Sequence, residues 1–506
     1  MILPFAPSTL IAASLLIPLA AALLLPLFHR QPNAREAVTL LAAAALACTV
    51  WNLLPHILAG GRPEMHVITI VPGIALAFKV EPLGLVFALV AGTLWIVNSV
   101  YSIGYMRGNN EPRQTSFYVC FAVALSATMG IAFSKNLFTL FIFYEALTLS
   151  TYPLVAHKGT MEARNGGRVY LGILLATSMV FLLPAIIATA VIAGTMDFVP
   201  GGILAGKVAP GLMGLLLALY VFGIGKAAVM PFHFWLPSAM VAPTPVSALL
   251  HAVAVVKAGV FTVLKVVVYI FGLETLSSTG SSEWLVYVAS ASLLLASMIA
   301  LTRTNLKARL AYSTVSQLAY IVLAASLATT VAATGGALHI VMHAAGKITL
   351  FFCAGAIYVA HHKTEIHELD GIGHKMPVTM LAFLIGTLSI IGLPPFGGSW
   401  SKWLIGLGAL DSGQAFVIGV LMLSSLLNVA YLMPIVARAF FVKPPPDSDD
   451  HHGHAHATTH KKASGGIEEA PLACLLALSF TALLCLVLFI FAGDVERLIA
   501  LAFVKA

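Results

Sequence analysis

The stretch YVFGIGKAAVMPFHFWLPSAMVAPTPVSALLHAVAVVKAGV, residues 220–260, contains two apolar helical segments, each with a lysine inside it. The first carries Lys226 and is broken around Met230-Pro231 and again at Pro237, whereas the second carries Lys257. A lysine at membrane depth is costly unless it is paired, hydrated or neutral. Proline breaks are tolerated in a spanning helix where the freed backbone is buried in protein or lines a watery cavity. The stretch therefore indicates an ion path through a membrane.

The composition of the whole chain agrees with a membrane protein. Of its 506 residues, 9% are charged and 59% are hydrophobic, and the mean hydropathy is +0.97; soluble domains carry about 25% charged residues. The net charge of +7 is too dilute to predict a nucleic-acid partner. The five cysteines form no CxxC pair, and we interpret them as small core residues rather than as a metal or redox framework. The first apolar run lacks a preceding basic region, so a cleaved signal peptide is not expected.

The apolar runs predict an all-α polytopic membrane protein with about fourteen transmembrane helices. Each run has at least 18 predominantly apolar residues, enough to cross about 30 Å of hydrocarbon. The predicted limits are 4–28, 36–58, 81–104, 115–133, 136–156, 168–193, 209–230, 245–272, 284–302, 308–329, 333–360, 378–408, 414–441 and 470–492.

Basic residues predict the orientation of these spans. Most Lys and Arg lie in loops after odd-numbered spans, and loops after even-numbered spans contain only Arg62, Lys79, Lys135 and Lys207. Because the more basic side of a membrane protein is cytoplasmic, we expect both termini outside the cell, in a multi-pass protein of the plasma (inner) membrane.

A short set of charges remains inside the spans. It comprises Glu145 in LFIFYEALTLS and five lysines: Lys226, Lys257, Lys265, Lys347 and Lys402. Lys265 lies where snorkelling to the headgroups explains it as well as function does. Glu145 has a purely structural alternative, as the partner of one lysine. For the remaining lysines, burial in hydrocarbon favours a functional role.

Histidines extend this set. In LHIVMHAAGKITLFF, His339, His343 and Lys347 recur every four residues and so share one face of a helix. Two such histidines can bind a metal, but Lys347 would repel a cation, and a proton relay is favoured because histidine titrates near neutral pH. His251 precedes Lys257 closely enough to pass protons through water. His233, in the break of the seventh span, is equally consistent with a wall residue and with a relay member.

These motifs resemble the proton-conducting, antiporter-like subunits of respiratory complex I, membrane-bound hydrogenases and Mrp-type cation/proton antiporters. The resemblance rests on GKAAVMPFHFWLPSAMVAPTPVSALLHAVAVVKAGVF, FIFYEALTLSTYPLV, HAAGKITLFFCAGAIY and GLPPFGGSWSKWLI, and it covers roughly residues 75–440. Among the branches of the family, the stretch LDGIGHKMPVTMLAFLIGTLSIIGLPPFGGSWSKW is most similar to the D-type Mrp subunit.

The resemblance implies an organisation of the chain. Spans 4–8 and 9–13 would form two inverted five-helix repeats, with helices 7 and 12 broken. The corresponding segments are three N-terminal helices in 1–110, the repeats in 111–275 and 276–441, a cytoplasmic His-rich loop in 442–469 and a last helix in 470–506. The family's titratable positions fall on Glu145, Lys226, Lys257 with His251 before it, His343, Lys347 and Lys402.

The resemblance also implies a function. The chain would be the proton-translocating subunit of a multi-subunit Na⁺/H⁺ antiporter, working with other membrane subunits and without a cofactor or bound metal. An ion pair between Glu145 and Lys226 would hold a proton on Lys226. Its separation would start proton movement through His251 and Lys257, then through His343 and Lys347, to Lys402.

Three alternatives remain at the level of sequence. The chain is also consistent with a pump module of a complex I-like oxidoreductase or hydrogenase, with a quinone-binding enzyme subunit, or with a membrane scaffold. The quinone enzyme is disfavoured because no flavin, haem or cluster motif is present. The loop KPPPDSDDHHGHAHATTHKKASGG has a composition that can bind metal, but a flexible loop is the favoured interpretation.

Overall fold

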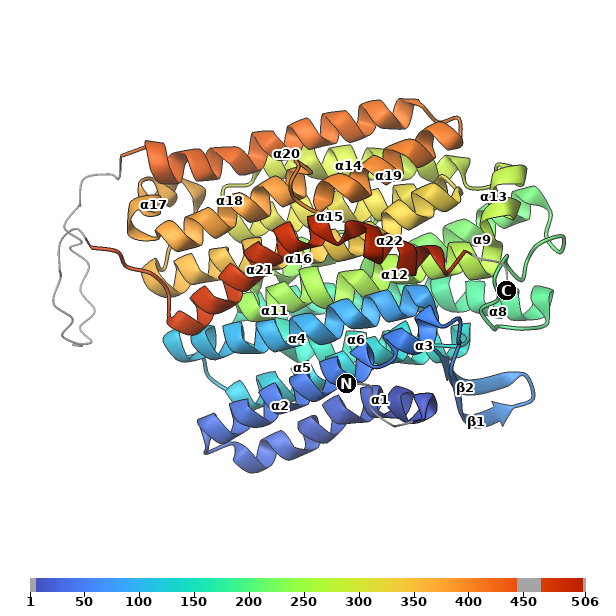
Figure 1. The fold of residues 1–506 in the computed structure, drawn as a ribbon, viewed down its shortest axis with the longest axis horizontal. Coiled ribbons are helices and arrows are strands. Elements are labelled where there is room, and N and C mark those ends of the chain that lie inside the picture. The colour runs from blue at the N-terminus through green and yellow to red at the C-terminus, as the bar shows by residue number, and fades with distance from the viewer. Residues whose placement is uncertain (1–5, 444–465, 504–506) are drawn as a thin grey trace.

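The computed structural model describes residues 6–443 and 466–503, except for the side chains of Leu250 and His251. Most of this part of the chain forms long helices that lie side by side (Figure 1). Within it, ten helices are long and apolar enough to cross a membrane, or eleven when one bent pair is counted as a span. The prediction of an all-α polytopic membrane protein is confirmed. Residues 444–465, which include the predicted His-rich loop, lie outside the described residues.

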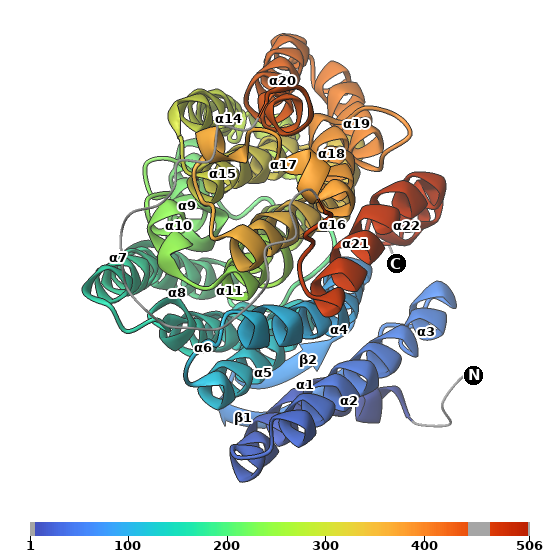
Figure 2. The ribbon, with the colours of Figure 1, turned by 90° about the vertical axis from the view of Figure 1, so that its left-hand side faces the viewer.

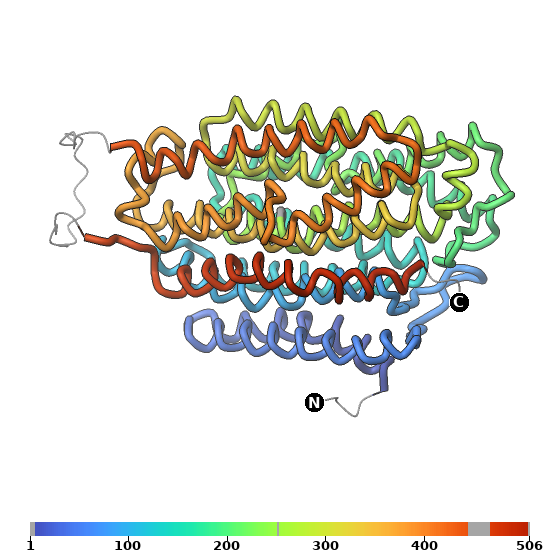
Figure 3. The backbone as a smooth tube through the Cα atoms, turned by 45° about the horizontal axis from the view of Figure 1, so that its top comes forward, coloured from blue at the N-terminus to red at the C-terminus, as the bar shows by residue number. Residues whose placement is uncertain are grey.

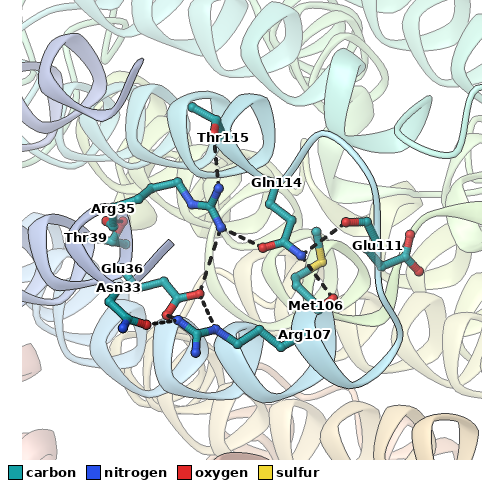
Figure 4. A network of polar contacts seen from close by, with 9 residues as sticks. All are labelled: Asn33, Arg35, Glu36, Thr39, Met106, Arg107, Glu111, Gln114 and Thr115. Atoms are coloured by element: carbon teal, nitrogen blue, oxygen red, sulfur yellow. Dashed lines mark hydrogen bonds and ion pairs between the residues drawn. The ribbon is translucent and has the colours of Figure 1, made fainter. Parts of the chain in front are cut away.

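The N-terminal helices form an outer layer on the bundle (Figure 2). They are α1 (Pro7–Leu24) with its extension η1 (Leu25–Phe28), α2 (Pro32–Trp51) and the short α3 (Leu54–Leu58), followed by α4 (Pro82–Gly108). Where α2 begins and α4 ends, a polar network joins the layers (Figure 4). Arg107 pairs with the buried Glu36. Arg35 donates at 2.6 Å to Gln114, the first residue of the next helix, α5 (Gln114–Ala132). Basic residues that predicted the topology therefore also fasten α2 to α4 and α5.

A β-hairpin that the sequence analysis did not predict precedes α4. Strands β1 (Glu64–Val71) and β2 (Ile74–Lys79) pair antiparallel, and Gly73 in the turn has a φ of +86°, which glycine adopts without a Cβ penalty. The hairpin lies at the end of the bundle opposite α17 (Ile372–Lys375) (Figure 1). The β-branched run HVITIV followed by Pro-Gly is the signal that indicates it.

Two five-helix units follow. The elements of the first are α5 (Gln114–Ala132), α6 (Leu137–Val155), α7 (Met161–Thr177) continued through η2 (Ser178–Leu182) into α8 (Leu183–Ala193), α9 (Pro210–Gly223), η3 (Gly225–Ala227), α10 (Trp235–Ser238), η4 (Ala239–Val241), α11 (Thr244–Ala248), η5 (Leu249–Val253), α12 (Val255–Val266) and η6 (Val267–Phe271). After α13 (Leu273–Thr279), the second unit comprises α14 (Glu283–Thr302), α15 (Leu306–Ser326), α16 (Thr330–His361), η7 (Ile366–Leu369), α17, α18 (Pro377–Ile391), α19 (Gly398–Asp411) and α20 (Phe416–Phe441). Because each unit crosses the layer an odd number of times, the second runs inverted relative to the first.

The predicted breaks in helices 7 and 12 are present. The first helix ends at Gly223 before the turn η3, and the second ends at Ile391 before α19 begins at Gly398. The peptide bonds Met230–Pro231 and Pro394–Pro395, one in each break, are cis. The backbone freed at the first break is satisfied inside the protein, because the Lys226 N–H donates to the Tyr144 hydroxyl at 3.1 Å and Trp235 Nε1 donates to the Gly225 carbonyl at 2.9 Å. Such satisfaction is what allows a broken helix at membrane depth.

The eighth predicted span contains an interruption that the sequence analysis did not predict. The π-helical turn η5, which contains the backbone of His251, separates α11 from α12. Next to it, α16 is buried along its length and lies between α11 and α18 (Figure 2). The last helices, α21 (Leu472–Ile490) and α22 (Ala492–Ala500), run along the bundle and contact α4 and α16 (Figure 3).

Candidate functional site

Lys226 lies in the first helix break and is fully buried. Its ammonium donates to the Tyr144 carbonyl at 2.9 Å and to Thr148 Oγ1 at 2.5 Å, and it lies 3.2 Å from the centroid of the Tyr144 ring. All three partners are uncharged and belong to α6. The break therefore places a lysine against a helix that supplies dipoles and an aromatic face rather than a carboxylate.

Glu145 is the next residue after Tyr144 on α6, and it is buried. Within the described part of the chain, neither of its carboxylate oxygens has a hydrogen-bond partner, and no basic group lies within 4.0 Å of it. The formed ion pair predicted between Glu145 and Lys226 is therefore wrong for this structure. The physical reason is that consecutive helical residues point in different directions, so that Lys226, which approaches the Tyr144 carbonyl and Thr148, does not reach the neighbouring carboxylate.

Lys257 on α12 connects the two repeats. Its Nζ lies 2.5 Å from Nδ1 of His343 on α16, and both side chains are almost completely buried. The backbone of α12 also lies against η3, because a Cβ built on Gly259 would stand 2.3 Å from the Ala227 nitrogen. The three elements that carry Lys226, Lys257 and His343 are thus packed directly together.

His339 extends this contact toward the second break. Its ring stacks on that of His343 with centroids 5.8 Å apart and planes 9° apart. Its Nδ1 lies 2.8 Å from Ser401 Oγ and its Nε2 lies 3.1 Å from Gln317 Oε1. Both ring nitrogens are engaged by polar side-chain groups, and in the described ranges no three His, Cys, Asp or Glu side chains gather to hold a metal ion. The geometry suits a relay better than a metal ligand.

Lys402 follows Ser401 and is held by the end of the broken helix. Its Nζ donates to the carbonyls of Ile390 and Ile391 at 2.9 and 2.8 Å and lies 3.3 Å from Ser425 Oγ. Free carbonyls at a helix C-terminus carry partial negative charge that favours a cation. Lys402 also lines a cavity of about 720 Å³. The second break therefore lies beside the cavity that Lys402 lines, as the prolines in the sequence predicted.

Lys347 occupies a side position rather than a step between the two histidines and Lys402. Its Nζ donates to Ser313 Oγ at 2.6 Å and to the Leu310 carbonyl at 3.3 Å. The Tyr431 hydroxyl reaches the same Ser313 at 2.8 Å. Although Lys347 shares a face of α16 with His339 and His343, it lies one turn beyond His343, and its long side chain reaches α15. The contacts in this structure run from Lys257 to His343, His339 and Ser401 without Lys347, and the predicted passage through Lys347 stays a prediction.

The remaining predicted histidines are less informative. The backbone of His251 lies in η5, and its side chain lies outside the described residues. His233 is buried with its ring centroid 4.1 Å from that of Phe234 and 6.0 Å from that of Tyr312. These aromatic surroundings favour the interpretation of His233 as a wall residue.

Lys265 does not snorkel. It is completely buried, and its Nζ lies 3.3 Å from Glu81 Oε2 and donates to the Ser134 carbonyl at 2.6 Å. The sequence analysis placed Glu81 at the first residue of the predicted span 81–104 and counted only Glu145 as an acid well inside a span. A buried lysine needs an acidic partner, and this need is the signal that points to Glu81. Polar partners on apolar helices were also missed: Tyr144, Thr148, Ser313, Gln317, Ser401, Ser425 and Tyr431.

Together the fold and these contacts define a class: a multi-pass membrane protein with two broken helices and a buried row of titratable groups between them. Comparison with known proteins gives the family. The family model described as NADH:quinone oxidoreductase/Mrp antiporter, transmembrane, matches residues 134–428. The chain belongs to this family, as the sequence motifs predicted.

Individual relatives come from both branches that the family name joins. The chain is 31% identical over 442 residues to NADH-quinone oxidoreductase subunit N of Desulforudis audaxviator, covering 86% of each chain. It is 30% identical over 452 residues to a probable K⁺/H⁺ antiporter subunit of Rhizobium meliloti, covering 87% of this chain but 44% of that protein. It is 33% identical over 374 residues to an Na⁺/H⁺ antiporter subunit of Alkalihalophilus pseudofirmus, covering 68% of this chain and 44% of that one.

Solved structures share the fold. A chain of the Mrp complex from Dietzia sp. superposes with a TM-score of 0.85 at 20% identity, covering 98% of this chain and 97% of that one. A chain of the membrane-bound sulfane sulfur reductase, an archaeal respiratory complex, superposes with a TM-score of 0.84 at 23% identity, covering 97% and 96%. At these identities the likeness supports the architecture alone.

Proposed function

We propose that the chain is the proton-translocating subunit of a multi-subunit monovalent cation/proton antiporter. The observation that carries the proposal is the contact of 2.5 Å between Lys257 Nζ and His343 Nδ1, which joins a buried amine of one repeat to a buried imidazole of the other. An amine and an imidazole in contact share one hydrogen bond, with one group donating and the other accepting, and can exchange its proton. Titratable groups inside a membrane protein are by default a mark of function.

Proton movement would combine these contacts with steps through water. A proton on Lys257 passes to His343 across their contact, and His339 exchanges a proton with Ser401. Water would carry it from His343 to the stacked His339 ring and from Ser401 to Lys402, where, among the described residues, no hydrogen bond joins the groups. Hydroxyl and imidazole groups both donate and accept, so each can pass a proton on, and a rotation or a change of tautomer then readies it for the next one. Lys402, beside its cavity, would be the end of the line from which the proton leaves.

Glu145 would control the other end. In this structure Lys226 binds the Tyr144 carbonyl and Thr148, while the neighbouring carboxylate is unpartnered within the described residues. A buried carboxylate gains most from a cation when water is excluded. A shift of Lys226 from the carbonyl to Glu145 would hold the proton on Lys226, and the reverse shift would release it toward Lys257.

The partners would be other membrane subunits. Relatives in the comparison are named as subunits of antiporters and oxidoreductases, and large apolar side chains are exposed around the Lys402 cavity, including Trp403 at 63% and Met422 at 69%. Such a surface is covered by lipid or by a neighbouring subunit. We expect the chain to lie in the plasma membrane. The distribution of basic loops predicts that both termini are on the outer side.

The test is proton/cation exchange in inverted membrane vesicles from cells that express the chain with its neighbouring subunits. Lys257→Ala removes the central amine and is expected to lower the exchange by about 100-fold or more. Lys207→Ala, in an exposed loop where Nζ donates to the Ala193 carbonyl, is the matched control and retains the parental rate. Parental exchange in Lys257→Ala vesicles that contain the assembled complex refutes the proposal.

A second candidate function is a proton pump of a complex I-like oxidoreductase. It is favoured by the 86% coverage of both chains in the match to NADH-quinone oxidoreductase subunit N. Purification of the complex separates the two functions. Iron–sulfur or flavin subunits that copurify, together with NADH-dependent acidification of the vesicles, support the pump; cation-dependent exchange without an electron donor supports the antiporter.

A further inference from the structure

Lys265 and Glu81 form an ion pair that the line from Glu145 to Lys402 does not use. Their side chains are 0% and 4% exposed. Ion pairs so deeply buried are weak contributors to stability, because the desolvation of both charges offsets their attraction. The location of the pair gives it a different significance, since Lys265 lies on the same helix as Lys257.

On α12, Lys257, Phe261 and Lys265 are spaced by four residues and so lie along one helix face. The two lysines are about 12 Å apart along the helix axis at 1.5 Å per residue. Phe261 stands between them: its ring centroid is 5.7 Å from Lys265 Nζ, and its ring packs at 4.9 Å on Phe87 of α4. The face therefore presents an amine, an aromatic plug and a second amine in turn.

Beyond Lys265, separate polar contacts lie between it and the hairpin surface. Lys265 donates to the Ser134 carbonyl, and the adjacent Lys135 binds Glu64 of β1 at 2.6 Å. Lys79 binds the same carboxylate at 3.1 Å. Partial burial raises the pKa of Glu64, but the hydrogen bonds and charges of the two lysines outweigh it and hold this pKa below its usual range. Glu64 is 41% exposed, so this charged cluster meets water at the hairpin end.

We propose that Lys265 and Glu81 form a second, gated proton branch that connects Lys257 to water at the hairpin end, with Phe261 as its gate. The inference rests on the proposed proton line. Lys265 gives its proton to the Glu81 carboxylate, which breaks an N–H bond and forms an O–H bond. The neutral Lys265 amine then accepts a proton from the Lys257 ammonium when the Phe261 ring moves aside. Glu81 finally releases its proton to water beside the hairpin, which restores the ion pair.

The alternative is a structural role, in which the pair only fastens α12 to α4. Lys265→Arg separates the two roles, because arginine keeps the charge and the pairing but does not release its proton. The branch predicts an assembled complex whose cation/proton exchange in inverted vesicles falls about tenfold or more, whereas a fastener predicts the parental rate. The neutral pair Lys265→Gln with Glu81→Gln is expected to show the same loss, and Lys207→Arg serves as the control.

A gain of function completes the test and does not depend on those variants assembling. Phe261→Ala removes the plug and is expected to raise the passive proton leak of the vesicles several-fold, and Glu81→Gln added to it is expected to return the leak to the parental level. Parental exchange in Lys265→Arg, or a Phe261→Ala complex without added leak, overturns the inference. If Lys257→Ala is inactive while Lys265→Arg is normal, the branch alone fails; if Lys257→Ala is also normal, the proposed function fails with it.

Discussion

Gly259→Ala tests the packing of η3, which carries Lys226, against α12, which carries Lys257, without altering any titratable group. Gly259 lies on α12 where this helix touches η3. A Cβ at this position would stand 2.3 Å from both the Lys226 carbonyl carbon and the Ala227 nitrogen. Ordinary van der Waals contact begins at 3.4 Å, so η3 and α12 must separate by about 1.1 Å. The atoms in the way are backbone, which no rotamer change relieves.

The expected cost follows from this displacement. Overpacking of a single methyl group typically costs about 1–3 kcal/mol, which a bundle of this size tolerates. A misplacement of about 1 Å in an aligned reacting pair, however, lowers a rate by about 100-fold. We therefore expect Gly259→Ala to leave the complex assembled while lowering cation/proton exchange by about that factor.

The assay compares exchange in inverted vesicles at equal amounts of assembled complex, measured on native gels. Gly172→Ala is the matched control: Gly172 also lies in a helix, but a Cβ there meets no atom within 4 Å. Its exchange is expected to equal that of the parent. Exchange at the parental rate in assembled Gly259→Ala would refute the reasoning that the spacing of η3 and α12 sets proton transfer.

Four further predictions use the same vesicles or the purified complex. Glu145→Ala is expected to abolish exchange without preventing assembly, because a buried carboxylate without a hydrogen bond contributes little to packing; normal exchange would remove it from the mechanism. Lys402→Ala is expected to block exchange, whereas Lys402→Glu retains part of it because a carboxylate also carries protons; an alanine variant as active as the parent would exclude Lys402. The chain reconstituted alone is expected to show little coupled exchange, and robust antiport by it would contradict the need for partner subunits. Because Lys135 and Lys79 lower the pKa of Glu64 against the effect of its partial burial, its ion pairs with these lysines persist at neutral pH and are lost as the pH falls through this lowered value; amide protection factors of residues 64–79, corrected for the intrinsic pH dependence of exchange, that stay equal between pH 7 and pH 3 would contradict this.

The features that could be predicted from sequence are those whose physical cost is local. A lysine in an apolar run or two prolines in a spanning helix are expensive wherever the rest of the chain lies. For this reason Lys226 and Lys402 were correctly placed at broken helices, and the spacing of His339 and His343 predicted their shared helix face. The π-helical turn η5 has no comparable local cost, and it was missed.

Pairwise contacts were less predictable, because they depend on where side chains meet in three dimensions. Glu145 was expected to touch Lys226, but the lysine reaches the carbonyl one residue before it. Glu81 was placed at the edge of the predicted span 81–104 and not among the charges inside the spans, yet the start of α4 beside the hairpin buries it against Lys265. Both outcomes depend on how helices that are far apart in sequence approach each other. Neither the hydrophobic periodicity nor the composition of the sequence contains this information.

The hydrogen-bond partners of Lys226, Lys347 and Lys402 differ in kind from the partner of Lys265. Lys226, Lys347 and Lys402 each donate to a backbone carbonyl and a hydroxyl, and these acceptors bind a neutral amine as well as an ammonium. Such a lysine keeps its position when its proton leaves, so the proton moves while the scaffold stays in place. Lys265 instead has the Glu81 carboxylate within 4 Å, which can take the lysine's proton directly. A lysine of this kind releases its proton only to its own acid, which makes Lys265 a controlled branch and not a further step in the open line.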